Sequence, residues 1–284
     1  MFKLIDGKMF SAAVKDRVKE EVARLKEKGI EGALAVIIVG NDPASKVYVG
    51  NKKKACEYVG IRSVEYALDE NTTQQELLAL VEKLNQDNSI IGILCQLPLP
   101  THLDDKEVIE KISAQKDVDC FHAENVGKMW IGEYSFKPCT PAGVMELLKA
   151  YDIDVEGKNC VILGRSNIVG KPMAALLLEK NATVTVCHSR TKNLKEICLN
   201  ADIIVAAVGR AKFVTADMVK DGAVVIDVGI NRNEEGKLCG DVDFEAVKEN
   251  ASYITPVPGG CGPMTIAMLM QNTLTSIKNM NKEV

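Results

Sequence analysis

Short apolar runs rich in Val and Ile alternate along the chain with segments whose apolar residues follow helical spacing. The runs predict two series of strands, at 33–39, 62–68 and 90–95, then at 159–163, 183–187, 202–208, 223–228 and 252–255. Continuous Val/Ile-rich strands that alternate with helices are typical of parallel sheets covered on both faces. The pattern therefore predicts an α/β fold with two domains, each built on a parallel sheet.

Helix start and stop signals divide the segments between these strands. We expect helices at 11–28, 43–59, 72–85, 140–151, 168–180, 191–199, 215–220, 243–249 and 263–279. Gly60 is expected to end the second helix, Thr72 and Thr73 to cap the third, and Thr140, followed by Pro141, to cap the fourth.

The long helices are expected to join two domains around a cleft. We expect one domain over 1–140 and a second over 141–263, with the last helix, about 264–284, packing back on the first. Ligands of open α/β sheets bind at the carboxyl ends of the strands. We therefore expect a ligand cleft shared by the two domains.

The charge balance excludes several partners. The 284 residues carry 35 Lys and Arg against 39 Asp and Glu, so the formal net charge is −4. This gives no basic surplus for nucleic acid or for a membrane surface. The apolar runs are far shorter than the roughly 18 residues that span a bilayer, and residues 1–10 lack the apolar core of a secretion signal. The sequence therefore predicts a cytoplasmic protein.

Cysteine and histidine are scattered. The nine cysteines are odd in number and show no C-x-x-C spacing, and the three histidines form no H-x-x-x-H pair. Neither a disulfide framework nor a metal site is expected, and free buried thiols in a reducing compartment fit better.

A glycine-bounded loop follows the strand at 159–163. It runs from Gly164 to Pro172 as GRSNIVGKP, where a dinucleotide-binding fold places its phosphate loop. Gly164 permits the sharp turn and Gly170 permits close packing of helix on strand. The spacing is G-x-x-x-x-x-G rather than G-x-G-x-x-G, so an ordinary strand-to-helix turn also explains it.

The next strand indicates which dinucleotide would bind. In NAD-binding folds this strand ends in Asp or Glu, which holds the ribose 2′-hydroxyl. Here it ends in His188, Ser189 and Arg190, and Arg165 lies on the neighbouring loop. A hydroxyl and two guanidinium groups suit a 2′-phosphate, so the sequence favours NADP, although solvated surface arginines would look the same.

Candidate chemical residues follow two strand ends of the first domain. Tyr48 and Lys52 lie four residues apart on one face of a predicted helix, a spacing also common on exposed helices. Lysine can carry protons, and Gln96, directly after a buried strand, can hydrogen-bond a lysine amine or a substrate carbonyl. Asp117 and Asp119 can each accept two N–H groups, although Asp is equally typical of turns.

A loop dense in Gly and Pro follows the last strand. It runs from Thr255 to Thr265 as TPVPGGCGPMT. Such a loop indicates backbone held close either to a ligand or to the domain junction. In the QLPLP segment that starts at Gln96, one X-Pro bond is a candidate for the cis form.

Nine segments together resemble the bifunctional methylenetetrahydrofolate dehydrogenase/cyclohydrolase family. They are YVGNKKKAC from Tyr48, QLPLP from Gln96, KDVD from Lys116, PCTP from Pro138, GRSNIVGKP from Gly164, CHS from Cys187, DVGIN from Asp227, GDVD from Gly240 and the TPVPGGCGPMT loop. The resemblance spans nearly the whole chain.

This resemblance implies two reactions of one-carbon metabolism, in which NADP+ oxidises 5,10-methylenetetrahydrofolate and water then opens the methenyl product to 10-formyltetrahydrofolate. The resemblance implies that these reactions serve purine, histidine and methionine biosynthesis. It also assigns Lys52 to proton transfer, Gln96 to orienting Lys52, Tyr48 to positioning the folate and Asp119 to binding the pterin ring. Pro258, Gly259 and Gly262 would line the folate side, and NADP would be held by Gly164, Arg165, Ser166, Ser189 and the backbone at Ile230. The resemblance also implies a Rossmann-like NADP-binding second domain and a homodimer joined through it.

Three residues depart from the family pattern. Cys120 and Cys261 stand where a small or aliphatic residue is usual, and Ala211 replaces a common proline. The two cysteines suggest sensitivity to oxidants or alkylating agents.

Two other functions fit the residues alone. One is an NADP-dependent dehydrogenase of another substrate, of hydroxy-acid or shikimate type, which gives no role to Lys52, Gln96 and Asp119. The other is a nucleotide sensor without catalysis.

Overall fold

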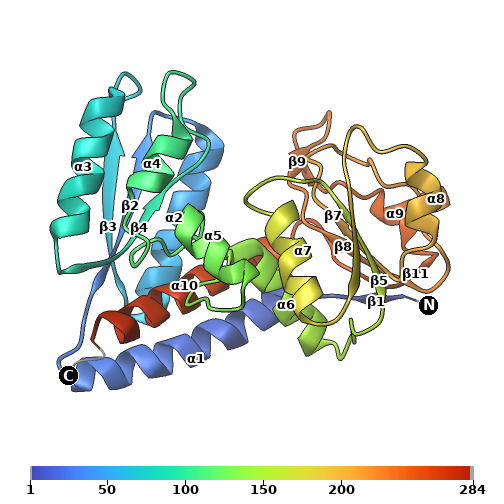
Figure 1. Cartoon of the computed structure of the whole chain (residues 1–284), viewed down its shortest axis with the longest axis horizontal. Helices are drawn as coiled ribbons and strands as arrows, with labels where there is room; N and C mark the ends of the chain where they lie inside the picture. The colour runs from blue at the N-terminus through green and yellow to red at the C-terminus, as the bar shows by residue number, and fades with distance from the viewer. Residues whose placement is uncertain (1, 282–284) are drawn as a thin grey trace. The chain divides into compact units, whose positions relative to one another are not determined.

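The computed structural model describes residues 2–281, which fall into two compact units (Figure 1). Unit 1 comprises the residues up to Ala12 together with Pro138–Thr265, and unit 2 comprises Ala13–Lys137 together with the residues from Ile266 on. Helices α1 (Gly7–Glu27) and α10 (Cys261–Met280) each contribute residues to both units. The units differ from the expected ranges at the N-terminus, because the short strand β1 (Lys3–Leu4) pairs with a strand of the second half.

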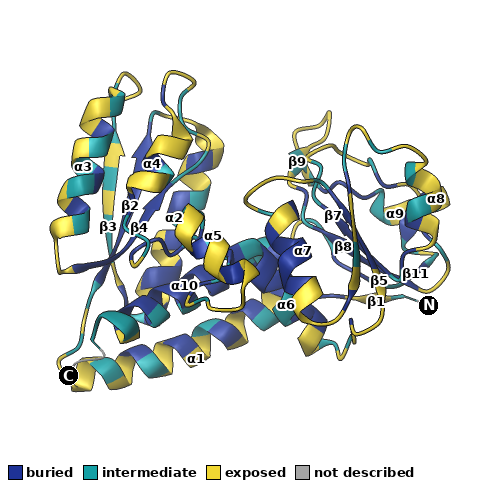
Figure 2. Cartoon of the chain, in the orientation of Figure 1, coloured by how far each residue is buried: buried dark blue, intermediate teal, exposed yellow. Residues whose placement is uncertain are grey.

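Unit 2 is built on a three-stranded parallel sheet with the order β3-β2-β4. Its strands are β2 (Ala33–Val39), β3 (Arg62–Leu68) and β4 (Ile90–Cys95), as the apolar runs predict. Every residue of β2 and β4 is buried, whereas β3 consists of exposed and half-buried residues (Figure 2). Both β3 and β4 are edge strands, but the segment at Lys116 and Asp117 pairs with Ile93 of β4.

Helices α2 (Pro43–Val59) and α3 (Gln74–Gln86) follow the first two strands of this sheet. Asp42 caps α2 by accepting a hydrogen bond from the backbone N–H of Ser45, and Gly60 ends the helix in the left-handed conformation, as expected. Thr73 and Glu76 form a capping box at the start of α3. The apolar faces of these elements meet in one cluster, which includes Ile37, Leu77, Val81 and Ile93.

Two further helices of unit 2 were not expected from the sequence. They are α4 (Asp105–Lys111) and α5 (Ala123–Trp130), each of two turns or so in a stretch dense in turn residues. Asp104 caps α4, and the His122 ring caps α5 by accepting from the N–H of Glu124. Local capping therefore starts helices that are too short to show a clear periodic pattern.

Unit 1 is built on a six-stranded parallel sheet with the order β1-β11-β8-β7-β5-β6. Besides β1, its strands are β5 (Asn159–Leu163), β6 (Thr183–Cys187), β7 (Ile203–Ala206), β8 (Ala223–Asp227) and β11 (Ala251–Ile254). Its helices are α6 (Cys139–Ala150), α7 (Gly170–Glu179), α8 (Leu194–Leu199), α9 (Phe244–Val247) and the 3-10 helix Ala216–Met218, and β9 (Asn231–Arg232) pairs antiparallel with β10 (Leu238–Cys239). The predicted two-domain α/β fold with parallel sheets is confirmed.

The start of α6 corrects one expectation. Pro138, not Thr140, occupies the N-cap, and its side chain makes no capping hydrogen bond. The Thr140 hydroxyl lies instead in the first turn, 2.9 Å from the hydroxyl of Thr265. The Thr140–Pro141 pair resembled a cap because a Pro in the first turn fits either position.

No helix within 2–281 is long and apolar enough to cross a membrane. In the same part of the chain, no group of three or more His, Cys, Asp or Glu side chains is arranged to hold a metal ion.

Candidate active site

The chain reverses its direction across the sheet of unit 2 at β2. It passes from β2 to β3 on one side and then to β4 on the other, so the strand order changes sense between β2 and β4. In open α/β sheets this point, at the carboxyl ends of the strands, is where ligands bind. Helix α2 follows β2 and Gln96 follows β4, so both supply residues to this place.

Lys52 and Gln96 meet there. The Lys52 side chain is buried, and its Nζ donates a hydrogen bond of 3.0 Å to Oε1 of Gln96. The amide nitrogen of Gln96 donates in turn to the carbonyl of Leu97 at 2.6 Å, and its backbone N–H donates to Ile37 at 2.8 Å. These bonds fix which end of the amide faces the lysine.

The rest of the α2 face agrees with the expected spacing. Tyr48, one turn before Lys52, is half-buried, and burial raises the pKa of its hydroxyl above the usual value. The hydroxyl therefore remains a neutral donor at pH 7. Lys53 and Lys54 are exposed, so Lys52 is the buried member of the lysine run.

The segment that carries Asp119 runs beside β4. The N–H of Ile93 donates to the carbonyl of Lys116 at 2.8 Å, and Ile93 forms a parallel bridge with Asp117. Asp119 is half-buried. Cys95 is the last residue of β4, and burial raises the pKa of its thiol to about 12. The negative charge of Asp119 raises this pKa further, and the positive charge of Lys52 lowers it. Lys52 and Gln96 therefore meet at the end of β4, and Asp119 lies on the segment that pairs with this strand.

Asp117 has a different position from Asp119. It is buried, and its carboxylate accepts from the N–H groups of Phe121 and His122 at 3.2 and 2.9 Å and from Nδ2 of Asn125 at 2.9 Å. Burial raises the pKa of this carboxyl group. Asp117 thus holds the loop that carries Asp119, a role that the sequence spacing alone did not separate from ligand binding.

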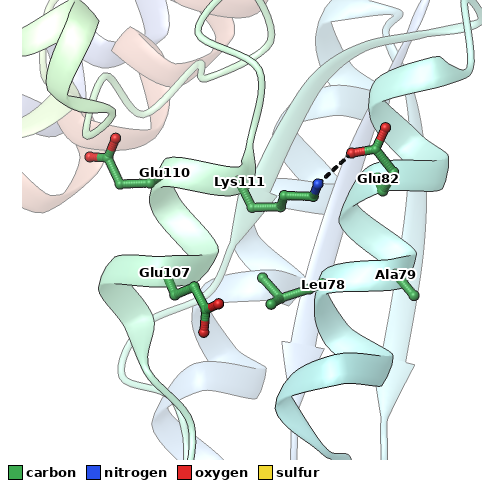
Figure 3. A pocket seen from close by; sticks show the side chains of 6 residues that line it. All are labelled: Leu78, Ala79, Glu82, Glu107, Glu110 and Lys111. Carbon is green, nitrogen blue, oxygen red and sulfur yellow. Dashed lines mark ion pairs between the residues drawn. The ribbon is translucent and has the colours of Figure 1, made fainter.

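A cavity of about 560 Å³ lies elsewhere in unit 2, between α3 and α4 (Figure 3). It is lined by Leu78, Ala79, Glu82, Glu107, Glu110 and Lys111, and Lys111 pairs with Glu82 at 2.7 Å. None of the expected site residues lines it. Its carboxylates and its amine lie on the solvent-facing surfaces of two helices, where charged side chains are stabilised by water and need no ligand.

Unit 1 has its own reversal of strand order, between β5 and β7. Gly164 follows β5 with a φ of 118°, and a Cβ there would lie 2.1 Å from the carbonyl oxygen of Ala207, just after β7. A Cβ on Gly170 would lie 2.2 Å from the carbonyl oxygen of Gly164. Both positions therefore require glycine, and they bring the loop and the start of α7 close to the strand ends.

The loop between these glycines suits a phosphate-bearing dinucleotide. The hydroxyl of Ser166 accepts from the N–H groups of Val169 and Gly170 at 3.1 and 3.3 Å, which orders the turn into α7. Arg165 is exposed on this loop, and Ser189 is exposed just after β6. The N–H of Gly164 donates to Cys187 at 2.9 Å, which ties the two segments together.

Two other loops of unit 1 carry the remaining expected residues. Ile230 follows β8, and its side chain is exposed. Pro258, Gly259 and Gly262 follow β11, in the same unit as the expected cofactor residues. The bond Leu97–Pro98 is cis, as expected for one X-Pro bond of the QLPLP segment, and Val257–Pro258 is a second cis bond that was not expected.

Comparisons with known proteins decide the family. Residues 5–119 match the model of the tetrahydrofolate dehydrogenase/cyclohydrolase catalytic domain, and residues 138–281 match that of the NAD(P)-binding domain of the same family. The chain belongs to this family. The resemblance read from its nine segments is confirmed.

Curated relatives and solved structures agree. The bifunctional protein FolD of Agathobacter rectalis is 64% identical, covering 98% of this chain and 100% of the relative. The structure of bifunctional FolD from Campylobacter jejuni aligns with a TM-score of 0.96 at 57% identity, over 98% and 99% of the two chains. The FolD of Trypanosoma brucei, solved with NADP and an inhibitor, aligns at 0.94 with 41% identity over 98% of each chain. A shikimate dehydrogenase from Aquifex aeolicus, at 17% identity, with a TM-score of 0.53 over 89% of this chain and 93% of that one, shares the fold alone.

The two unusual cysteines lie inside the protein. Cys120 and Cys261 are buried, and burial raises the pKa of each thiol. Cys120 also donates a hydrogen bond to the carbonyl of Phe136 at 3.4 Å. Of the nine cysteines, Cys239 alone is partly exposed. A protonated, inaccessible thiol reacts poorly, so the structure speaks against the expected sensitivity of Cys120 and Cys261.

A buried carboxyl group lies at the end of β8. Asp227 accepts from the N–H groups of Gly229, Asp241 and Val242 at 2.9, 3.0 and 2.9 Å. Burial nevertheless raises its pKa to about 6, and the nearby carboxylate of Asp241 adds to the rise.

Alkylation of the native protein should begin at Cys239. Brief treatment with iodoacetamide at pH 7.5, followed by peptide mass spectrometry, is expected to label Cys239 well before Cys120 and Cys261, because only its thiol reaches solvent. In urea all three should react alike. Early labelling of Cys261 in the native protein would contradict the buried position.

The free energy of unfolding should depend on pH through the titration of Asp227. Between about pH 4 and pH 6 the folded carboxyl group holds a proton that the unfolded one has lost, so this group's contribution decreases as pH rises, by up to about 3 kcal/mol. Urea unfolding followed by circular dichroism should show this slope in the difference between wild type and Asp227→Asn. Asp221→Asn, at an exposed turn, is the control and should leave the slope unchanged. Parallel pH curves for wild type and Asp227→Asn would refute the assignment.

Proposed function

We propose that this chain oxidises 5,10-methylenetetrahydrofolate with NADP+ and hydrolyses the resulting 5,10-methenyltetrahydrofolate to 10-formyltetrahydrofolate. Membership of the dehydrogenase/cyclohydrolase family supports both activities. The observation that carries the proposal is the buried Lys52–Gln96 pair at the strand-order reversal of unit 2. Hydride transfer needs no proton carrier, whereas hydrolysis does, and a lysine held by an amide suits that role.

Hydrolysis needs a group that moves protons in both directions. As an amine, Lys52 takes a proton from the water that attacks the methenyl carbon. As an ammonium, it returns that proton to the ring nitrogen as the bond between this nitrogen and the carbon breaks, and the remaining hydroxyl proton passes to solvent as the formyl carbonyl forms. Gln96 accepts from Nζ and so keeps the amine in place through both transfers. Tyr48, a neutral donor, positions the folate, and Asp119 accepts N–H groups from the pterin ring.

Unit 1 supplies the residues for the cofactor. NADP+, when bound, accepts the hydride from the methylene carbon. Gly164 and Gly170 allow the backbone to approach its phosphates, and Ser166 orders the loop between them. Arg165 and Ser189, both exposed beside that loop, suit the 2′-phosphate, and the backbone at Ile230 suits the other end of the cofactor.

The remaining parts of the proposal rest on the resemblance. Pro258, Gly259 and Gly262 line the folate side, and the folate-binding and NADP-binding roles divide between the half of the chain up to about residue 140 and the half that follows. A cleft shared by the two domains, a homodimer joined through the cofactor domain and a location in the cytoplasm stay predictions of the sequence.

The other candidate functions have less support. Shikimate dehydrogenases share the fold at 14–17% identity, which says nothing about substrate. A nucleotide sensor would need no buried lysine at the strand ends of unit 2.

Replacing Lys52 should separate the two activities. Lys52→Met keeps most of the side chain but cannot carry a proton, so we expect hydrolysis of methenyltetrahydrofolate to fall by about a hundredfold or more. The decay of methenyltetrahydrofolate absorbance measures this directly. Lys53→Met, at the exposed neighbour, is the control and should hydrolyse like wild type.

Both steps should be assayed on the same preparations. NADPH formation from methylenetetrahydrofolate should be seen with wild type, and a flat trace would favour the sensor. Hydrolysis by Lys52→Met at the wild-type rate, with folding intact by circular dichroism, would remove Lys52 from the proposed mechanism.

The cofactor preference should depend on Arg165 and Ser189. We expect wild type to use NADP+ more efficiently than NAD+, and Arg165→Ala with Ser189→Ala to reduce that preference by at least about tenfold, because a 2′-phosphate loses its charged and hydroxyl partners. Ratios of kcat/KM for the two cofactors measure it. Lys180→Ala, an exposed cation at the end of α7, should leave the ratio unchanged. Equal use of both cofactors by wild type would contradict the assignment.

A further inference from the structure

A second buried carboxylate lies beside Asp227 in unit 1. Asp241, between β10 and α9, is fully buried. Its Oδ2 accepts from the backbone N–H groups of Val208 and Gly209 at 2.6 and 3.0 Å. Its Oδ1 accepts from the N–H of Arg210 and from Nδ2 of Asn231, both at 2.9 Å. One side chain thus holds the loop after β7 and the loop after β8.

Asp227 holds the backbone on both sides of this arrangement. It bonds the N–H of Gly229, in the loop after β8, and also the N–H groups of Asp241 and Val242. Its own N–H donates to the hydroxyl of Thr255 at 2.7 Å. The backbone that carries Asp241 is therefore itself anchored to the end of β8.

The surrounding backbone is built around these two carboxylates. A Cβ on Gly240 would lie 1.8 Å from Oδ2 of Asp227, and a Cβ on Gly229 would lie 2.2 Å from Oδ1 of Asp241. Any larger residue at either position would push a carboxylate away from its N–H donors. The close approach of these carboxylates explains why glycine stands at positions 229 and 240, in the DVGIN and GDVD segments.

The two loops lie where the cofactor is expected. They leave the carboxyl ends of the adjacent strands β7 and β8, and β7 borders the reversal of strand order. Ala207, at the start of the first loop, approaches Gly164 of the phosphate loop. Gly209, Arg210 and Ile230 are exposed, so the same loops present their outer surface to solvent while Asp241 holds their inner N–H groups.

Loops held in one conformation before binding lose less conformational entropy when a ligand arrives. Four hydrogen bonds to one charged, buried acceptor fix both loops at once, because charge-assisted hydrogen bonds are stronger than neutral ones. An exposed surface loop without such an anchor would sample several conformations.

We propose that Asp241 is a positioning residue, which holds loops 208–210 and 228–231 in the conformation that NADP+ binds. The proposal rests on the proposed function, because it takes NADP+ as the ligand. It adds a residue that touches no part of the cofactor and acts through the backbone that does.

Asp241→Asn tests this proposal. The asparagine has the size of the aspartate, but its NH2 group cannot accept the N–H groups that one carboxylate oxygen now receives. We expect the Kd for NADP+, measured by titration calorimetry on cofactor-free protein, to rise about tenfold, as the loss of one or two such bonds implies. The KM for NADP+ should rise in parallel, with kcat at saturating cofactor within about twofold of wild type. Hydrogen–deuterium exchange of segments 208–210 and 228–231 should quicken without cofactor.

Two further variants keep the test decisive. Asp243→Asn is the matched control: it lies two residues along the chain, its side chain pairs with Lys212 at 3.5 Å, and it should bind NADP+ like wild type. Asn231→Ala removes only one donor to Asp241, so it provides a milder variant if Asp241→Asn does not fold, with an expected rise in Kd of about threefold.

The outcomes separate the two proposals. Failure of wild type to bind NADP+ would overturn the proposed function. Binding by wild type together with an unchanged Kd in the Asp241 and Asn231 variants would overturn the positioning role alone. A fall in melting temperature and in kcat, with Kd and loop exchange unchanged, would make Asp241 a general structural residue and would also overturn the positioning role.

Discussion

In a parallel sheet every strand delivers its backbone to the same edge, and the two strands beside a reversal of order send their following segments to opposite faces. Both units of this chain have such a reversal, at β2/β4 in one and at β5/β7 in the other. Several of the residues assigned to chemistry or to the cofactor follow from this constraint. Lys52 comes from the helix after β2, Gln96 directly follows β4, and Gly164 directly follows β5.

The segments that leave these edges carry backbone N–H groups with no strand partner, and buried carboxylates satisfy many of them. Asp117 binds the turn before α5, Asp227 binds the turn after β8, and Asp241 binds the turn after β7. A carboxylate can accept several N–H groups from different loops, which a backbone carbonyl seldom does. The same chemistry therefore shapes the surroundings of the expected folate and cofactor sites in both units.

Much of the fold could be predicted because its signals are local. Strands such as 33–39 and 159–163 are continuous apolar runs, and helices α2 and α3 have clear side-chain caps. The short strand β1 escaped prediction because two residues have no periodicity, and it forms only by pairing with β11, about 250 residues away. Helices α4 and α5 escaped because their turn-rich sequence hides their caps.

The site could be predicted where residues follow strand ends, as Lys52 and Gln96 do. The sequence could not separate Asp117 from Asp119, because the two differ in burial and not in spacing. It also gave no sign that Asp227 and Asp241 meet, since their contact depends on the return of the chain through β9 and β10. The resemblance to a family contributed the order of the motifs, whereas the burial of their carboxylates emerged only from the fold.

Neither unit is a continuous stretch of chain. The sheet of unit 1 joins β1, near the start, to β11, and in unit 2 the Asn272 side chain of α10 donates to the carbonyls of Val118 and Lys137, both at 2.8 Å. During synthesis on the ribosome, the segment that carries Asp119 must therefore wait for the last helix to emerge before it gains this support. The earlier half of the protein reaches its final form only after the residues of α10 have been made.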